Sequence, residues 1–241
     1  MNNKPSATQG VGNNDLAAGI RNRAIQVVAT LLIQALILFL SAGKLDWGAA
    51  WVLLGVHVCI LLFNMLVIVP RNPEMVAERG RVKENTKGWD KLLTSFLSIF
   101  ALLTLVVAGL NARFGWPPLM VLWLQVVGLV LVALGQLLFS WSMASNKFFS
   151  GVVRIQDDRG HSVATGGPYR YVRHPGYIGY ITFTVGAALA LGSFWALVPA
   201  AITGLVLVVR TALEDRTLLA ELDGYQDYAR QVRYRLLPGV W

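Results

Sequence analysis

Long stretches without a charged residue alternate with short polar segments along most of the chain. Four of these stretches are Ala24–Ala42, Trp47–Pro70, Leu92–Ala112 and Trp116–Asn146. A helix needs about 20 apolar residues to cross a bilayer, and each stretch has roughly that length or more. The pattern therefore predicts four membrane-spanning helices in the first 146 residues.

A fifth apolar region runs from His174 to Val209 and contains no Asp, Glu, Lys or Arg. One helix over this region would be about 54 Å long, too long for a hydrocarbon core of about 30 Å. Gly192-Ser193 lies near its middle and is suited to a tight turn. We therefore expect a hairpin of two helices and about six transmembrane helices in an all-α integral membrane protein.

Composition and charge support this topology. Hydrophobic residues make up 55% of the chain and charged residues 14%, against roughly 25% charged residues in soluble domains. With six spans, 19 of the 21 Lys and Arg residues fall on one side, and only Lys44 and Arg113 lie on the other. The positive-inside rule then places both termini in the cytoplasm. Five spans would put the C-terminal arginines on the wrong side.

The chain divides into three parts in this interpretation. Residues 1–20 are polar, lack the apolar core of a signal peptide and predict a disordered tail. Residues 21–145 form the four-helix transmembrane region, and residues 146–241 hold the candidate catalytic region. The net charge of +8 follows the span ends rather than a separate basic stripe, which disfavours nucleic-acid binding. The single cysteine, Cys59, excludes an internal disulfide, and we predict no metal site.

The segment Gly166–Tyr177 is the most polar and aromatic part of the second half. It holds three glycines, two prolines, three tyrosines, two arginines and a histidine. Such a segment predicts a folded loop that presents backbone amides and polar side chains on the cytoplasmic face.

The helix after the hairpin carries the other candidate residues. Arg210 and Glu214 stand at i and i+4 on one face, and Asp215 points about 100° away. We expect this helix to continue to about Leu222, where Asp223-Gly224 stops it. Because the hairpin brings this turn beside the loop, the two together predict a site for a nucleotide-like cofactor, with access for a lipophilic substrate. A plain surface ion pair and a loop-packing His174 are the alternatives.

Two features stay open at the level of sequence. The segment Arg71–Lys91 contains a short predicted helix, Pro73–Arg79. It is either a basic connector that contacts lipid headgroups or a wall of the site. His57, inside the second span, is either a packing residue or a functional one.

The run from Gly167 to Tyr177 resembles the G-x-Y-x-x-x-R-H-P-x-Y motif of the isoprenylcysteine carboxyl methyltransferase family. Arg210 to Tyr225, with Pro238-Gly239, is similar to that family's C-terminal region, although Asp215 stands where the family has a second glutamate. Asn72–Gly80 is similar to a loop of bacterial members. The resemblance covers most of the chain from about residue 71.

The resemblance implies a multi-pass enzyme of a bacterial inner membrane that uses S-adenosyl-L-methionine to methylate a carboxyl group. It implies two catalytic residues: Arg210 would meet the acidic group of a lipophilic or lipidated substrate, and Glu214 would also hold the cofactor. The remaining cofactor-binding residues that it implies are Arg154, His161, Ser162, Val163, Ala164, Tyr169, His174, Pro175, Gly176 and Tyr177.

Three alternatives remain. A sterol-reductase-like membrane enzyme shares a similar R-H-P-x-Y signature but uses NADPH. A phospholipid N-methyltransferase would methylate an amine instead of a carboxyl group. A non-catalytic scaffold or small transporter would need no cofactor, but its facing polar groups at mid-membrane are missing from the pattern. The substrate and the oligomeric state are not indicated by the sequence.

Overall fold

The computed structural model describes residues 13–81 and 86–241, and this described part is helical without a strand. Five of its helices are long and apolar enough to cross a membrane. They are α1 (Asn13–Ala42), α2 (Gly48–Arg71), α4 (Gly88–Phe114), α5 (Leu122–Ala144) and α7 (Leu197–Glu221). The expected all-α, multi-pass membrane fold is confirmed.

Helices α6 and α7 form the expected hairpin. Helix α6 (Pro175–Ala190) is joined to α7 through a turn in which Gly192 has a φ of 76°. The Ser193 hydroxyl fixes this turn by donating to the Asn111 side chain over 2.7 Å. Of the six expected spans, α6 is the short one: its 16 residues extend about 24 Å, less than the hydrocarbon thickness of about 30 Å. The turn takes up part of the apolar region, which leaves too few residues for a longer helix.

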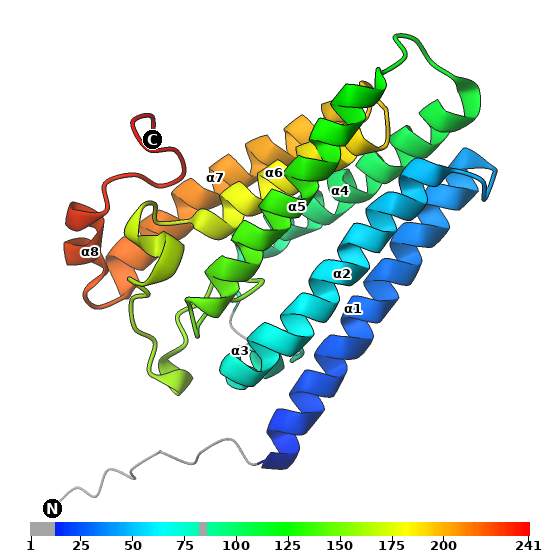
Figure 1. The fold of residues 1–241 in the computed structure, drawn as a ribbon. Coiled ribbons are helices and arrows are strands. Elements are labelled where there is room, and N and C mark those ends of the chain that lie inside the picture. The colour runs from blue at the N-terminus through cyan, green and yellow to red at the C-terminus, as the bar shows by residue number, and fades with distance from the viewer. Residues whose placement is uncertain (1–12, 82–85) are drawn as a thin grey trace, which may run out of the picture.

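Helices α5 and α6 pack with their backbones in close approach. A Cβ atom on Gly135 would lie 2.5 Å from the backbone nitrogen of Phe183, and one on Gly179 would lie 2.6 Å from the carbonyl oxygen of Gly135. Small residues at such crossings are typical of membrane helix pairs, because they let dispersion contacts form along the backbone. This packing holds α6 between α5 and α7 (Figure 1).

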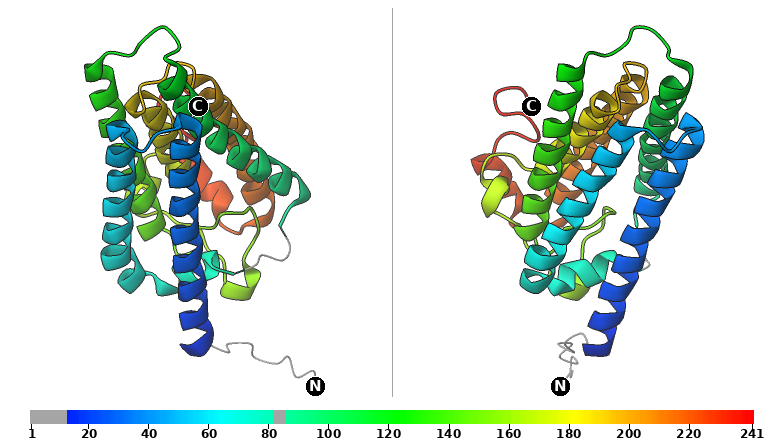
Figure 2. Two further views of the ribbon diagram at one scale, coloured as in Figure 1. Left: turned by 90° about the vertical axis from the view of Figure 1, so that its right-hand side faces the viewer. Right: turned by 45° about the vertical axis from the view of Figure 1, so that its right-hand side comes forward.

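All polar connectors that matter for the site lie at one end of the bundle (Figures 1 and 2). These are the short helix α3 (Pro73–Arg79), the segment between α5 and α6 with its 3₁₀ turns η1 (Asp157–Arg159) and η2 (Gly167–Arg170), and α8 (Tyr225–Gln231) with the C-terminal residues. The start of α1 lies at the same end. The predicted sidedness, with this end in the cytoplasm, stays a prediction.

The helix boundaries differ from the expectation at two places. Residues 13–20 are helical instead of part of a disordered tail, because Gly19 packs closely on Ala77 of α3; residues 1–12 lie outside the described part. The fourth span begins at Leu122 rather than Trp116. Pro117-Pro118 accounts for this, since a proline pushes the residue before it out of the helical region.

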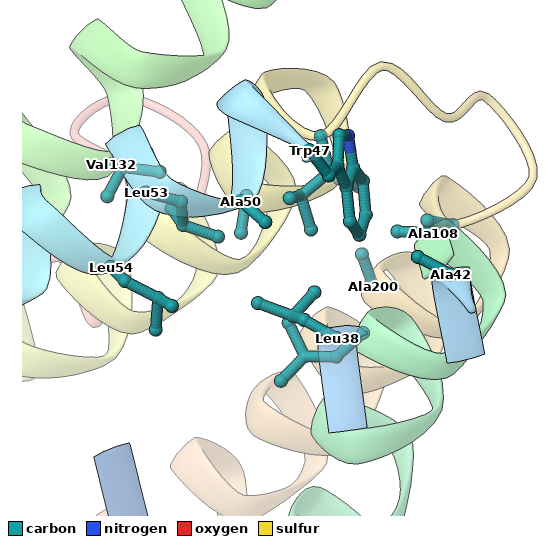
Figure 3. Packing of buried hydrophobic residues seen from close by; sticks show 14 residues of the cluster. Leu38, Ala42, Trp47, Ala50, Leu53, Leu54, Ala108, Val132 and Ala200 are labelled. Atoms are coloured by element: carbon teal, nitrogen blue, oxygen red, sulfur yellow. The ribbon is translucent and has the colours of Figure 1, made fainter. Parts of the chain in front are cut away.

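The main hydrophobic core lies toward the opposite end, where α1, α2, α4, α5, α6 and α7 meet. In Figure 3 the ring of Trp47 points toward Ala42, Ala108 and Ala200. A second, smaller cluster, formed by Leu222, Tyr225 and Tyr228, packs under the segment between α5 and α6. The first cluster holds the bundle, and the second supports the candidate site.

Candidate active site

A cavity lies at the connector end, between the segment 146–177, the last turns of α7 and helix α8. Its volume is about 100 Å³, and it is partly open to solvent. The residues that line it are Asn146, Phe148, Phe149, Ser150, Val152, Val153, Arg154, Gln156, His161, Ser162, Val163, Ala164, Tyr169, Arg173, His174, Gly176, Tyr177, Glu214, Leu218, Leu222, Tyr225 and Tyr228.

The buried side chain of Gln156 shapes the outer part of this wall. It donates to the carbonyl oxygen of Phe148 over 2.7 Å and accepts from Arg159 over 2.6 Å. The Gln156 backbone N–H donates to Nδ1 of His161 over 3.3 Å. Burial lowers the pKa of His161, which agrees with a neutral ring that accepts this hydrogen bond. These contacts turn residues 161–164 along the cavity.

A buried carboxylate on α7 holds the R-H-P motif in place. Asp215 accepts both Nε and Nη2 of Arg173 over 2.8 Å, and Nε of Arg235 over 2.7 Å. It also accepts the Tyr225 hydroxyl over 2.9 Å and lies 3.3 Å from Nε2 of His174. We call these five residues the Asp215 network. Because a buried charge is costly unless it is paired and hydrogen-bonded, the network is a structural element of the site.

The C-terminal segment adds backbone hydrogen bonds to the same motif. The N–H groups of Arg173 and His174 donate to the carbonyl oxygens of Tyr234 and Arg235 over 2.9 and 3.0 Å. Nη1 of Arg173 donates to the carbonyl oxygen of Val232 over 2.9 Å. The chain after α8 therefore fixes the entrance to α6 from outside.

Glu214, one residue before Asp215, faces the cavity. Its Oε2 accepts the hydroxyl of Tyr177. The Tyr177 ring stacks on His174 with their planes 2° apart and their centroids 5.8 Å apart. The expected convergence of the loop and the α7 turn is confirmed, since His174, Tyr177 and Glu214 line one cavity.

Arg210 lies outside the cavity wall, and its charge is compensated within the protein. Its Nε donates to the fully buried Asp90 over 2.7 Å, and its Nη2 donates to Asp90 over 3.3 Å and to the carbonyl oxygen of Gly151 over 3.0 Å. Asp90 also accepts the Val153 N–H over 2.8 Å. Arg210 and Glu214 were expected to lie on one helical face and could have paired with each other. In the structure Arg210 binds Asp90, and Glu214 accepts the hydroxyl of Tyr177.

Helix α3 forms an outer buttress of the site. Nη2 of Arg154 donates to Glu78 of α3 over 2.8 Å, and Nη1 donates to Asp158 over 2.9 Å. The same ion pair lowers the pKa of Asp158. This contact favours the second interpretation of the segment Arg71–Lys91, as a wall rather than a free connector.

The comparisons with known proteins find methyltransferases that are similar to part of this chain. A family model described as phospholipid methyltransferase matches residues 123–222. A protein-S-isoprenylcysteine O-methyltransferase of Xenopus laevis is 25% identical over 146 residues, covering 58% of this chain and 48% of that protein. The Schizosaccharomyces pombe protein of the same name is 32% identical over 114 residues, covering 45% and 47%. The chain spans about half the length of these curated relatives.

A solved structure extends the likeness to most of the fold. The eukaryotic intramembrane Ras methyltransferase ICMT, an isoprenylcysteine carboxyl methyltransferase, matches with a TM-score of 0.52 and 19% identity, covering 89% of this chain and 75% of that one. Over residues 123–222 the chain is similar to phospholipid methyltransferases, and over most of its length it shares the fold of ICMT. It is an integral multi-pass membrane protein.

The family match covers α5, α6, α7 and the segment between α5 and α6, which together supply nearly all of the cavity wall. Most of the residues expected to bind a cofactor lie on that wall. They are Arg154, His161, Ser162, Val163, Ala164, Tyr169, His174, Gly176, Tyr177 and Glu214. Pro175 is absent from the wall and occupies the first turn of α6. The roles of all these residues stay predictions.

The sequence interpretation missed two groups of residues. The aromatic part of the cavity wall is formed by Phe148, Phe149, Tyr225 and Tyr228. Nothing in the sequence pointed to these residues other than their position near the candidate segments. Asp90 had a clearer signal: it is an acidic residue at the start of an apolar helix, where a buried charge requires a partner.

Proposed function

We propose that this protein is a membrane-embedded methyltransferase that transfers a methyl group from S-adenosyl-L-methionine to the carboxyl group of a lipophilic, isoprenylcysteine-like acceptor. The observation that carries the proposal is the single cavity in which Glu214, Tyr177 and His174 meet residues 161–164. This cavity lies in the part of the chain that matches the methyltransferase family, and the names of the relatives favour the carboxyl acceptor.

The residues of the cavity suit such a cofactor. Glu214 provides a negative group for a cation, and the Tyr177 hydroxyl that it accepts holds it in place. Nε of Arg154 is buried and has no hydrogen-bond partner in the described part of the chain, so it offers a donor to the carboxylate of an amino acid. Residues 161–164 and Tyr169 offer backbone and hydroxyl groups to a nucleoside. S-adenosylmethionine, when bound, supplies an electrophilic methyl group on a positively charged sulfur.

The work left to the protein is positioning and exclusion of water. S-adenosylmethionine, held by Glu214 and Arg154, would supply the methyl group and would become S-adenosylhomocysteine, and the acceptor would supply the carboxylate oxygen that takes the methyl group. Since the acceptor is already ionised, no proton moves and no general base is required. Tyr177 orients Glu214, and the aromatic residues Phe148, Phe149, Tyr225 and Tyr228 shield the cavity from water.

A second candidate is N-methylation of a phospholipid amine, which the description of the matching family model favours. The two candidates use the same cofactor but differ in the acceptor. An amine must lose a proton in the course of methylation, whereas a carboxylate has none to lose. The chemistry of the product therefore separates the two candidates.

The test is a methyl-transfer assay with purified protein in phospholipid vesicles that contain phosphatidylethanolamine. S-adenosylmethionine with a labelled methyl group is added together with an N-acetyl-S-isoprenylcysteine. We expect label in a lipophilic product that mild base releases as methanol, as an ester requires. Base-stable label on phosphatidylethanolamine would instead establish the second candidate. Absence of label with both acceptors would contradict a methyltransferase function, and a melting temperature raised by NADPH alone would favour a reductase.

A further inference from the structure

Arg79, the last residue of α3, has no carboxylate partner among residues 13–81 and 86–241. Its Nε and Nη1 atoms are buried and have no hydrogen-bond partner in the described part of the chain. The group lies against two aromatic rings that contact each other, with its central carbon 5.3 Å from the ring centre of Phe149 and 5.9 Å from that of Phe139. Cation–π contacts of this kind compensate only part of a buried charge.

The surroundings of Arg79 are positive. Burial lowers the pKa of Arg79 to about 9, and the positive charges of Arg23 and Arg210 add to this effect. Arginine remains charged at neutral pH even so. Arg210 has Asp90 as its partner, whereas the one side-chain hydrogen bond of Arg23 within the described residues goes to the neutral side chain of Gln26. Because two guanidinium nitrogens of Arg79 are buried without a partner among the described residues, and leaving a buried charge unpaired is costly, an anion would be stabilised at this position.

The arginines nearer the polar loop differ from Arg79 in this respect. Arg154 pairs with Glu78 and Asp158, and Arg173 and Arg235 share Asp215. Arg210, which the sequence assigned to the acidic group of a substrate, uses two of its nitrogens on Asp90 and Gly151. Arg79 therefore has two nitrogens, Nε and Nη1, that no described residue engages and that are free to bind a ligand, whereas two of the three nitrogens of Arg210 are already engaged.

Arg79 is one aromatic ring away from the cavity. Phe149 lines the cavity and lies against α6, where a Cβ atom on Gly176 would be 2.8 Å from Cε2 of its ring. On the other side, Phe149 meets Phe139 edge-on at 5.2 Å, and Phe139 in turn packs against Tyr180. The Arg79 side of Phe149 thus adjoins an aromatic surface on α5 and α6, which suits the apolar part of an acceptor.

We propose that Arg79 binds the carboxylate of the lipophilic acceptor and is the residue by which the site distinguishes the acid from its neutral methyl ester. This inference rests on the proposed function and assigns a residue to its acceptor. The guanidinium matches a carboxylate in charge and hydrogen-bonding geometry. Methylation removes the negative charge, so the same contact weakens in the product and favours its release.

The test measures binding, so that it is independent of turnover. An N-acetyl-S-isoprenylcysteine and its methyl ester are titrated into protein saturated with S-adenosylhomocysteine, for the wild type, Arg79→Gln and Arg79→Lys. We expect the wild type to bind the acid at least about tenfold more tightly than the ester, Arg79→Gln to bind the two equally, and Arg79→Lys to recover part of the difference. Arg71→Gln, which removes an exposed cation two residues before α3, is the matched control and should retain the preference.

A stability measurement separates this role from a structural one. Without acceptor, Arg79→Gln should melt at the wild-type temperature or above it, because the substitution removes an uncompensated buried charge. The proposal is overturned if the wild type shows no preference for the acid, if Arg79→Gln keeps the preference, or if Arg79→Gln melts well below the wild type. Failure of the proposed function is a different result, namely wild-type protein that forms no methyl ester.

Discussion

Two neighbouring carboxylates on α7 have opposite surroundings. Asp215 is fully buried and accepts hydrogen bonds from two guanidinium groups and a phenol. Glu214 borders the cavity and accepts only the Tyr177 hydroxyl among the described hydrogen bonds. Since successive helical residues point about 100° apart, one turn of helix serves two purposes. Asp215 holds the site together, and Glu214 is available to a ligand.

The largest effect is expected from Asp215→Asn. This substitution leaves the charges of Arg173 and Arg235 without a partner, which costs about 3–5 kcal/mol when a buried pair is broken. The melting temperature should fall by on the order of 10 °C, and cofactor binding should fall with it. Thermal unfolding followed by circular dichroism in detergent measures the change. Asp227→Asn, at an exposed pair on α8, is the control; an Asp215→Asn protein as stable as this control would refute the structural assignment.

The opposite behaviour is expected from Glu214→Gln. It removes a charge that faces the cavity, so kcat/KM for methyl transfer should fall about 100-fold, equal to about 2.7 kcal/mol. The melting temperature should stay within about 2 °C of the wild type. Glu221 lies on the same helix as Glu214 and forms an exposed ion pair with Lys87. The control variant Glu221→Gln should change neither quantity. Equal losses of stability in Glu214→Gln and Asp215→Asn would erase the distinction between the two carboxylates.

Tyr177→Phe sharpens the same distinction on a smaller scale. The variant keeps the ring stacked on His174 but loses the hydroxyl that orients Glu214. We expect the Kd for S-adenosylmethionine to rise about tenfold, or about 1.4 kcal/mol, without a loss of stability. Calorimetry measures the Kd, and Tyr171→Phe, an exposed tyrosine of the same motif, is the control. An unchanged Kd would mean that the hydroxyl has no part in holding Glu214 for the cofactor.

The smallest effect is expected from pH, through His161. Burial lowers the pKa of His161 below its ordinary value of about 6.5. In the unfolded chain the ring takes up a proton first, so the stabilisation present above about pH 6.5 is lost as pH falls toward the lowered folded pKa. The acceptor for the Gln156 N–H is lost over the same interval. Unfolding between pH 8 and 5.5 should show this decrease in the wild type and a weaker one in His161→Gln.

The membrane fold was largely predictable from the chain. The stretches without charged residues predicted the positions of α2 and α4, and Pro73 and Gly80 marked the bounds of α3. Gly192-Ser193 marked the turn of the hairpin. These features succeed because they depend on local backbone chemistry and on the thickness of a bilayer. The short length of α6 was harder to predict, since the end of this helix depends on how many apolar residues belong to the turn.

The candidate site was predictable in its membership but not in its pairings. The motif and the spacing of Glu214 brought the right segments together, because a hairpin returns both to one end of the bundle. The partner of Arg210 is Asp90, 120 positions away, and only the packing of α4 on α7 decides it. The burial of the Arg79 Nε and Nη1 atoms is equally hard to predict, since a basic residue in a polar connector is normally solvated.

The account depends most directly on cofactor binding by the cavity. Calorimetric titration of S-adenosylmethionine into the purified, folded protein should give one binding site per chain, and Glu214→Gln should weaken this binding while Glu221→Gln leaves it unchanged. A folded wild-type protein that releases or absorbs no heat of binding, and whose melting temperature S-adenosylmethionine does not raise, would contradict the account.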